Sequence, residues 1–252
     1  MAITETAQRN HERLFPGRKS TLLKTDPELI EVFDNFAFDE LLADHQIDER
    51  LRLLLILASL IAQQALSEYR VMIEAALTVG VSPVEIKEVL YQAIPYIGIG
   101  KAYDFLHATN DVLREHDVEL PLPAQSTTNP STRHNAGRAV TLAIFGEVIE
   151  RMIENTPEDQ QHIQDYIASF GFGDFYSRTG LDLATRELVT LSILLSMGDC
   201  EPQLKAHTRG NLNVGNDRRL LIDVITQLLP YVGFPRTLNA LRCLDEVEPS
   251  KL

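Results

Sequence analysis

The chain has 252 residues, of which 44% are hydrophobic and 23% charged, a balance typical of a globular protein with a sizeable buried core. Its formal net charge of −13, with no run of lysines and arginines, opposes binding to a polyanion and predicts no nucleic-acid partner. The apolar run from Leu51 contains Arg52 and falls short of a membrane span of roughly 20 residues. Because the N-terminus also lacks the apolar segment of a secretory signal, we expect a cytoplasmic protein without a membrane partner.

Apolar residues recur at three- and four-residue spacing through most of the chain, which predicts amphipathic helices and an all-α fold. Asp26-Pro27 is the first signal for a helix start, and Thr156-Pro157 repeats it later. The stretch 82–85, Ser-Pro-Val-Glu, has the spacing of a capping box. Gly80 and Gly215 each follow an apolar run and are expected to end a helix.

Those two glycines belong to an internal repeat. The segments 78–99 and 213–234 share Val, Gly, Val, Gln, Pro, Tyr and Gly at a constant offset of 135 residues. With one inserted residue upstream, Arg50 falls opposite Arg186, so the repeat begins before the shared glycine. The sequence therefore predicts one helical unit written twice.

The region between the two copies contains three prolines and a Ser/Thr-rich centre, which disfavours both helix and strand. We expect an N-terminal copy over residues 1–115, a linker over 116–133, and a C-terminal copy over 134–252 that holds the functional site.

One polar column stands out in the second copy. Gln203, His207 and Asn211 are four residues apart and share a helix face beside a leucine stripe. Three such positions offer more hydrogen-bonding capacity than a helix face usually buries, which favours a pocket in which His207 exchanges a proton. A core histidine satisfied by one hydrogen bond is the alternative interpretation.

The corresponding column of the first copy is largely apolar. It carries Met72 where the second copy has His207, and Glu68 and Ala76 at the flanking positions. We therefore expect the first copy to serve structure or to line the pocket of the second, with no comparable cavity at Met72.

Two arginines precede the polar column. Arg178 and Arg186 could each hold a carboxylate of a small acidic ligand through a bidentate guanidinium contact. Alternatively, they are structural partners of Asp174, Asp182 or Glu187.

Other chemical groups give weaker signals. Cys200 and Cys243 form no CxxC motif and are expected to be free thiols. Neither HExxH nor metal-binding Cys/His spacing occurs, so no metal site is predicted.

Four segments of the second copy, in fixed order, resemble the carboxymuconolactone decarboxylase family. The resemblance covers nearly all of residues 134–247 and, more loosely, residues 29–114, so the chain looks like a tandem member. The four segments are RTGLD from Arg178, TRELVTLSILLSMG from Thr185, QLKAHTRGNLNVG from Gln203 and QLLPYVGFPRTLNAL from Gln227.

This resemblance implies the helical fold shared with alkylhydroperoxidase D, and a homo-oligomer in which a trimer of two-copy chains equals six units. It implies release of carbon dioxide from a small cyclic acid such as a carboxylated butenolide, without a cofactor, as in aromatic compound catabolism. By the same resemblance His207 is the proton donor, with Gln203 or Asn211 stabilising the developing enolate. Arg178 or Arg186 would hold the carboxylate, and Tyr231 is a further substrate-binding candidate.

Two other functions stay open. The peroxidase branch of the superfamily uses a CxxC pair with a histidine four residues after the second cysteine. In this chain the corresponding positions are Cys200 and Gln203, so the dithiol cycle cannot run and at most a residual peroxidase is expected. A helical binding or assembly protein without turnover is the remaining alternative.

Overall fold

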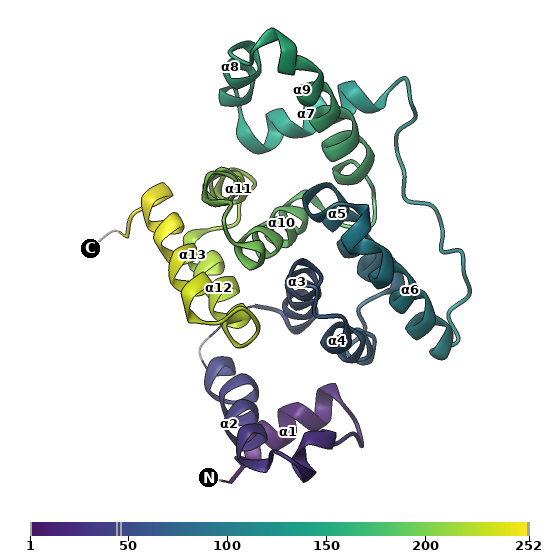
Figure 1. Cartoon of the computed structure of the whole chain (residues 1–252), viewed down its shortest axis with the longest axis vertical. Coiled ribbons are helices and arrows are strands. Elements are labelled where there is room, and N and C mark those ends of the chain that lie inside the picture. The colour runs from purple at the N-terminus through teal and green to yellow at the C-terminus, as the bar shows by residue number, and fades with distance from the viewer. Residues whose placement is uncertain (1, 44, 46, 251–252) are drawn as a thin grey trace.

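The computed structural model describes residues 2–43, 45 and 47–250, and within these ranges the chain forms helices and no strand (Figure 1). The all-α prediction is confirmed. None of the described helices is both long enough and apolar enough to cross a lipid bilayer.

The helices fall into two series along the chain. The first series is α1 Glu5–Leu14, η1 Thr21–Lys24, α2 Pro27–Phe38, η2 Glu40–Leu42, α3 Glu49–Ala62, α4 Leu66–Thr78, α5 Pro83–Ile97 and α6 Ile99–Glu115. The second series is α7 Arg133–Phe145, α8 Val148–Glu154, η3 Glu158–Gln160, α9 Gln161–Tyr166, η4 Ile167–Tyr176, α10 Leu183–Met197, α11 Glu201–Asn213, α12 Arg218–Val232 and α13 Phe234–Val247.

The predicted repeat is present in the helix boundaries. Helices α11 and α12 begin and end 135 residues after α4 and α5, and α13 begins 135 residues after α6. Gly80 and Gly215 follow the ends of α4 and α11 with φ of 85° and 100°, a conformation that disfavours residues with a Cβ. The expectation of two matching helical units is confirmed.

Upstream of Gly80 and Gly215, the structure aligns the two units differently from the match of Arg50 with Arg186 that the sequence predicted. Asp48 and Asp182 are the N-caps of α3 and α10, so Arg52 and Arg186 each lie four residues after a cap. The match of Arg50 with Arg186 was wrong. Helix α10 has 15 residues and α3 has 14, so the extra residue lies within the helix. Arg50 instead pairs with Glu85 at the surface.

The three predicted helix starts differ in how their caps are formed. At Ser82 both hydrogen bonds of the capping box with Glu85 are formed. Pro27 opens α2, but the side chain of Asp26 does not cap it. The signal at Thr156-Pro157 opens η3, which continues without a break into α9 and η4, so the predicted helix start is confirmed.

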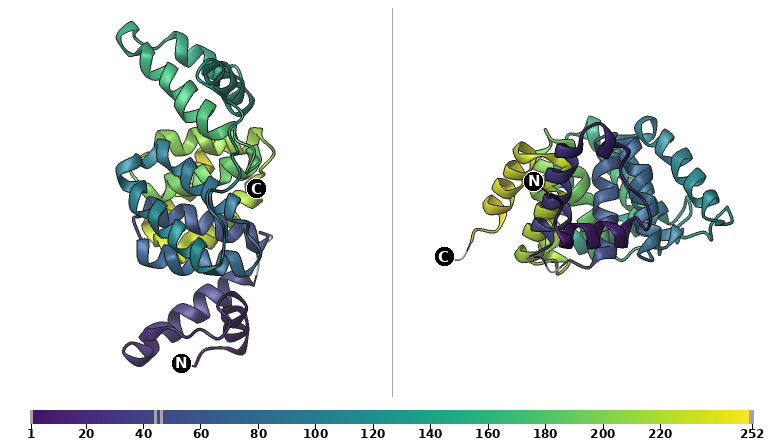
Figure 2. Two further views of the ribbon diagram at one scale, coloured as in Figure 1. Left: turned by 90° about the vertical axis from the view of Figure 1, so that its right-hand side faces the viewer. Right: turned by 90° about the horizontal axis from the view of Figure 1, so that it is seen from below.

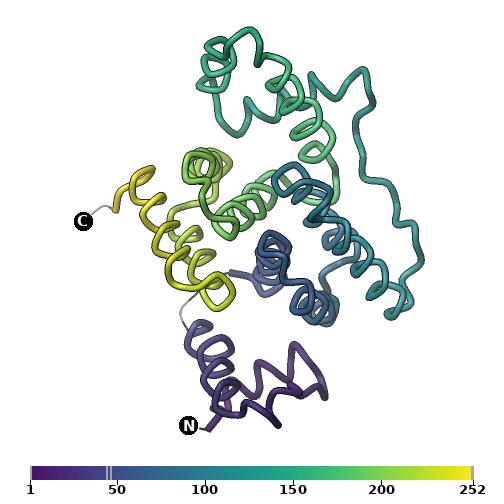
Figure 3. The backbone as a smooth tube through the Cα atoms, viewed as in Figure 1, coloured from purple at the N-terminus to yellow at the C-terminus, as the bar shows by residue number. Residues whose placement is uncertain are grey.

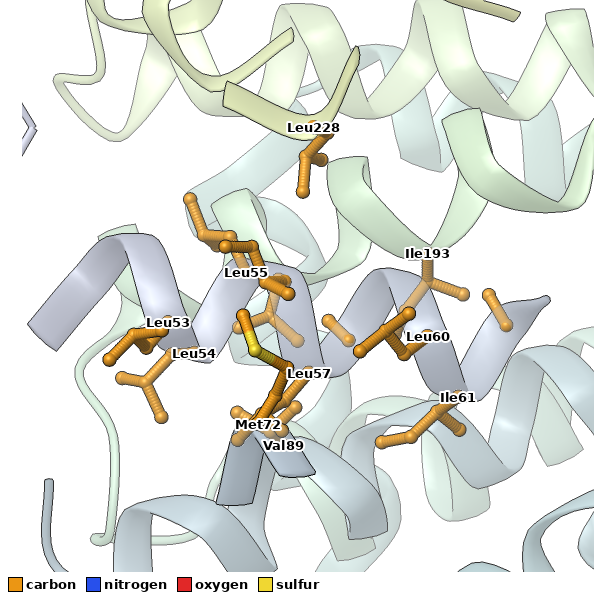
Figure 4. Packing of buried hydrophobic residues seen from close by; sticks show 14 of the residues in the cluster. Leu53, Leu54, Leu55, Leu57, Leu60, Ile61, Met72, Val89, Ile193 and Leu228 are labelled. Atoms are coloured by element: carbon orange, nitrogen blue, oxygen red, sulfur yellow. The ribbon is translucent and has the colours of Figure 1, made fainter. Parts of the chain in front are cut away.

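The core is shared by the two units. Helices α3 and α10 pack against each other at the centre, and α5 and α12 contact both of them. In Figure 4, Leu55 and Leu57 of α3 lie among labelled residues of its neighbours, namely Met72 of α4, Val89 of α5, Ile193 of α10 and Leu228 of α12. Most residues of α3 and α10 are buried, which is expected of helices that are apolar on nearly all sides. Neither unit has a complete core without the other.

The leading segments of the two units lie at opposite ends of the molecule (Figure 2). Helices α1 and α2 form one end, and α7, α8, α9 and η4 form the other. Between α6 and α7, residues 118–129 run outside the helices without regular structure (Figure 3). Thr179 donates its backbone N–H to the carbonyl of Gln125, which attaches this stretch to the second unit.

Gly137 permits the close approach of α7 to η4. A Cβ added there would lie 1.7 Å from the carbonyl oxygen of Ala168, whereas one added at Gly171 would meet nothing within 4 Å. We expect Gly137→Ala to lower the free energy of unfolding by about 1–3 kcal/mol, because the added methyl group overpacks the contact between α7 and η4. Gly171→Ala is the matched control and should leave it nearly unchanged. Urea titration measures both, and equal effects of the two substitutions would contradict this account.

Candidate functional site

Glu187 and His207 form a buried pair between α10 and α11. The Nδ1 atom of His207 lies 3.0 Å from Oε2 and 3.2 Å from Oε1 of Glu187, whose side chain is fully buried. Asp182 caps α10 by accepting from the N–H of Thr185, which fixes the helix start at Leu183, four residues before Glu187. Gly210 lets the helices approach, since an added Cβ would lie 2.6 Å from Oε2 of Glu187.

A network of three hydroxyl groups reaches the same carboxylate through Tyr176. Tyr176 donates to Oε1 of Glu187 at 3.0 Å and also contacts the hydroxyl of Thr190. Tyr96, on α5 of the first unit, places its hydroxyl 3.0 Å from that of Tyr176. Burial and the charge of Glu187 raise the pKa of both phenols above the usual value, so they stay protonated at neutral pH. They are hydrogen-bond donors in this site.

The second ring nitrogen of His207 is uncommitted. An ionised carboxylate can only accept, so its contact with Glu187 places a proton on Nδ1, and in the neutral imidazole Nε2 is then the acceptor. No described residue forms a hydrogen bond with Nε2. Phe145 and Tyr96 lie edge-on to the ring at centroid distances of 5.3 Å and 5.9 Å. The single contact with Glu187 is what a core histidine satisfied by one hydrogen bond would make, and the free Nε2 is what a proton-transfer group requires, so the two interpretations are separated by the activity of a His207 variant.

Asn211 and Gln203 do not join His207 as the polar column suggested. Asn211 is fully buried, donates to the carbonyls of Glu187 and His207, and accepts from Asn216 at 2.8 Å. Its amide holds α11 against α10 and is not free for a substrate. Gln203 lies in the first turn of α11, where it is exposed to solvent and makes no hydrogen bond to a described residue.

The two arginines have a partner that the sequence reasoning did not consider. Arg186 is fully buried and donates to Glu88 at 2.8 Å and to Gln92 at 2.7 Å, both on α5. Arg178 donates from Nε to the same carboxylate at 2.8 Å and 3.0 Å. The acidic residues nearby in sequence are therefore not their partners. With Glu88 already bound, neither guanidinium lies open beside His207 for a substrate carboxylate.

Tyr231 lies in the other half of the molecule. It lines a cavity of about 680 Å³ beside α2 and α4, together with Glu68 and Phe38. Each unit places one tyrosine in the other unit, because α5, with Tyr96, packs against the second unit and α12, with Tyr231, packs against the first. Tyr96, which the repeat places opposite Tyr231, is the tyrosine at His207. The repeat offset itself was the signal that could have identified Tyr96.

The first unit lacks the reactive pair. Leu53, five residues after its helix cap, stands where the second unit has Glu187, and Met72 stands where it has His207. Met72 is buried and does not line the neighbouring cavity. As expected, no comparable cavity lies at Met72, although Glu68 and Val71 on the same helix line the cavity at Tyr231.

Comparison with known proteins places both units in one family. The model of the carboxymuconolactone decarboxylase family matches residues 27–111 and again residues 161–246, together more than half of the chain. This chain belongs to the carboxymuconolactone decarboxylase family. Glu187 and His207 of this family member lie in the second matched segment and Tyr96 lies in the first. The tandem organisation inferred from the repeat is confirmed.

Several relatives are similar to one unit of this carboxymuconolactone decarboxylase family member. The 4-carboxymuconolactone decarboxylase of Acinetobacter baylyi is 33% identical over 120 residues, which are 47% of this chain and 89% of that protein. A nitrosuccinic acid decarboxylase of Metarhizium robertsii is 26% identical over 95 residues, or 38% of this chain and 66% of that one. The relatives thus support a decarboxylase kind of activity.

One solved structure matches both units. A protein from Burkholderia xenovorans, provisionally assigned as a gamma-carboxymuconolactone decarboxylase subunit, superposes with a TM-score of 0.57 at 20% identity and covers 96% of each chain. At that identity the likeness establishes the fold alone. Within residues 2–43, 45 and 47–250 of this family member, no three His, Cys, Asp or Glu side chains are grouped as metal ligands would be.

Proposed function

We propose that this chain is a cofactor-independent decarboxylase of a small cyclic carboxylic acid, such as a butenolide of the carboxymuconolactone type. The observation that carries the proposal is the free Nε2 of His207, held by a buried carboxylate and surrounded by aromatic rings. Such an imidazole can deliver a proton to carbon inside a site from which water is largely excluded.

The chemistry divides into two steps. Cleavage of the bond to the carboxylate releases carbon dioxide and leaves its electron pair on the ring, where the alkene passes it toward the lactone carbonyl as an enolate. Glu187 stabilises the imidazolium of protonated His207, whose Nε2–H then gives its proton to carbon and leaves a neutral imidazole. Solvent returns a proton to Nε2 after the product leaves. Tyr96, a protonated donor beside the ring, takes the enolate-stabilising role that the sequence suggested for Gln203 or Asn211.

The proposal is tested by measuring carbon dioxide release from a panel of carboxylated lactones and β-keto acids. Turnover of at least one cyclic acid by the wild-type chain supports it. Binding of these acids with no release from any of them would favour the alternative of a helical binding protein without turnover.

The thiols separate this proposal from a residual peroxidase. Burial and the adjacent acidic side chains raise the pKa of Cys200, which lowers the thiolate fraction at neutral pH. Its Sγ donates to the carbonyl of Leu194. We expect Cys200→Ser to keep decarboxylase turnover within about twofold of wild type, since no thiol takes part in the steps above. Loss of most turnover in this variant would revive the peroxidase interpretation.

A further inference from the structure

A second cavity lies beside Glu88 and Arg178. It has a volume of about 420 Å³, with walls from α5 and α6 and a roof from residues 120–125 of the stretch between the units. Neither His207 nor Glu187 lines it. The cavity is therefore distinct from the candidate active site.

The charge at this cavity is unbalanced. Lys87 is 93% buried, given its 7% exposure, and its ammonium group bonds to the amide oxygen of Asn110, with no carboxylate within ion-pair distance in the described part of the chain. Arg178 also lines the cavity, but it shares the single carboxylate of Glu88 with Arg186. Lys87, Arg178 and Arg186 are thus buried or nearly buried, and Glu88 is the single carboxylate shared among them. This local excess of positive charge occurs in a chain whose formal net charge is −13.

Such an excess is costly, because a buried charge without a counter-charge loses hydration that nothing replaces. Burial and the nearby Arg114 lower the pKa of Lys87, which reflects the same unfavourable environment. An anion seated in the cavity would supply the missing counter-charge. Arg114, on α6, also lines the cavity, with its guanidinium paired to Asp111 at the surface.

One part of the remaining wall is apolar, beside the amides of Asn110 and Gln125. The ring of Tyr91 lies 5.2 Å from the guanidinium carbon of Arg178 and 5.9 Å from the ammonium nitrogen of Lys87. The roof contributes Leu120, Pro121, Leu122 and Pro123. A ligand that matches both features carries its charge at one end and a compact apolar body at the other.

We propose that this cavity binds a small organic carboxylate with an aromatic or alicyclic body, at a site that is separate from the His207 site. The carboxylate pairs with Lys87, and the body lies against Tyr91 and the proline-rich roof. The proposal rests on the charge and shape of the cavity and does not depend on the reaction proposed above.

The test is calorimetric titration of the full chain with benzoate, with benzyl alcohol as the neutral analogue and with inorganic phosphate as an anion without an apolar body. We expect benzoate to bind, and both comparison ligands to bind at least about tenfold more weakly, because each lacks one of the two matched features. Equal binding of benzyl alcohol would overturn the role of the charge. Equal binding of phosphate would overturn the role of the apolar walls.

Variants locate the site. Lys87→Met should weaken benzoate binding about tenfold or more, while Lys87→Arg, which keeps the charge, should stay within a few-fold of wild type. Lys101→Met changes an exposed lysine of α6 outside the cavity and is the matched control. If Lys87→Met fails to fold, Arg114→Gln, a change at a largely exposed side chain on the cavity wall, should weaken binding several-fold.

A His207→Gln variant distinguishes the two sites. Benzoate binding should survive it, even if all carbon dioxide release is lost. Loss of benzoate binding in His207→Gln together with retention in Lys87→Met, or no binding to the wild-type chain, would overturn the proposal.

Discussion

His207→Gln should lower turnover of any acid that the wild-type chain decarboxylates by about 10²–10⁴-fold, the range that general acid catalysis contributes. Glutamine can still donate a hydrogen bond to Glu187, but it has no proton to give to carbon at neutral pH. Because the contact with the carboxylate can be kept, we expect the free energy of unfolding to fall by no more than about 1–2 kcal/mol. Carbon dioxide release and thermal melting of the same preparation measure the two effects.

Gln203→Ala is the matched control for that experiment. It removes an exposed polar side chain one helical turn before His207, outside the buried network, and should leave turnover within a few-fold. The opposite result for His207→Gln, a large loss of stability with turnover retained in the folded fraction, would show that His207 is a structural histidine and would end the proposed mechanism.

Glu88→Ala should be the most destabilising of the substitutions considered. Glu88 is buried and is the shared carboxylate partner of Arg186 and Arg178. Removing it leaves the fully buried guanidinium of Arg186 without a counter-charge, which typically costs about 3–5 kcal/mol of folding free energy. Urea unfolding, analysed with a common slope for wild type and variant, measures the change.

An exposed ion pair provides the comparison. Asp111 pairs with Arg114 at 3.1 Å on the surface of α6, where both side chains are more than half exposed. Asp111→Ala should therefore change the free energy of unfolding by less than about 1 kcal/mol, because water screens such a pair. A small effect of Glu88→Ala, comparable with that of Asp111→Ala, would mean that the buried arginines find other partners or take up water.

The helical class, the two-copy organisation and the ends of the central helices were determined by the sequence itself. These features follow from spacing within short segments: apolar residues at three and four positions, the capping box at Ser82, and glycines that tolerate positive φ after α4 and α11. The family was also recognisable from the sequence, through four short segments in fixed order. The same local reasoning selected His207 as the central residue of the candidate site.

The partners of that histidine were decided only by the tertiary structure. Glu187 was treated as a possible companion of an arginine, yet it binds His207. Arg186 instead donates a hydrogen bond to Glu88, 98 residues away in the chain. Because the two units share one core, α5 crosses to the second unit and carries Tyr96 to the site while α12 carries Tyr231 away. Spacing along a helix fixes which face a side chain occupies, but the packing of helices distant in sequence decides which charge or hydroxyl it meets there.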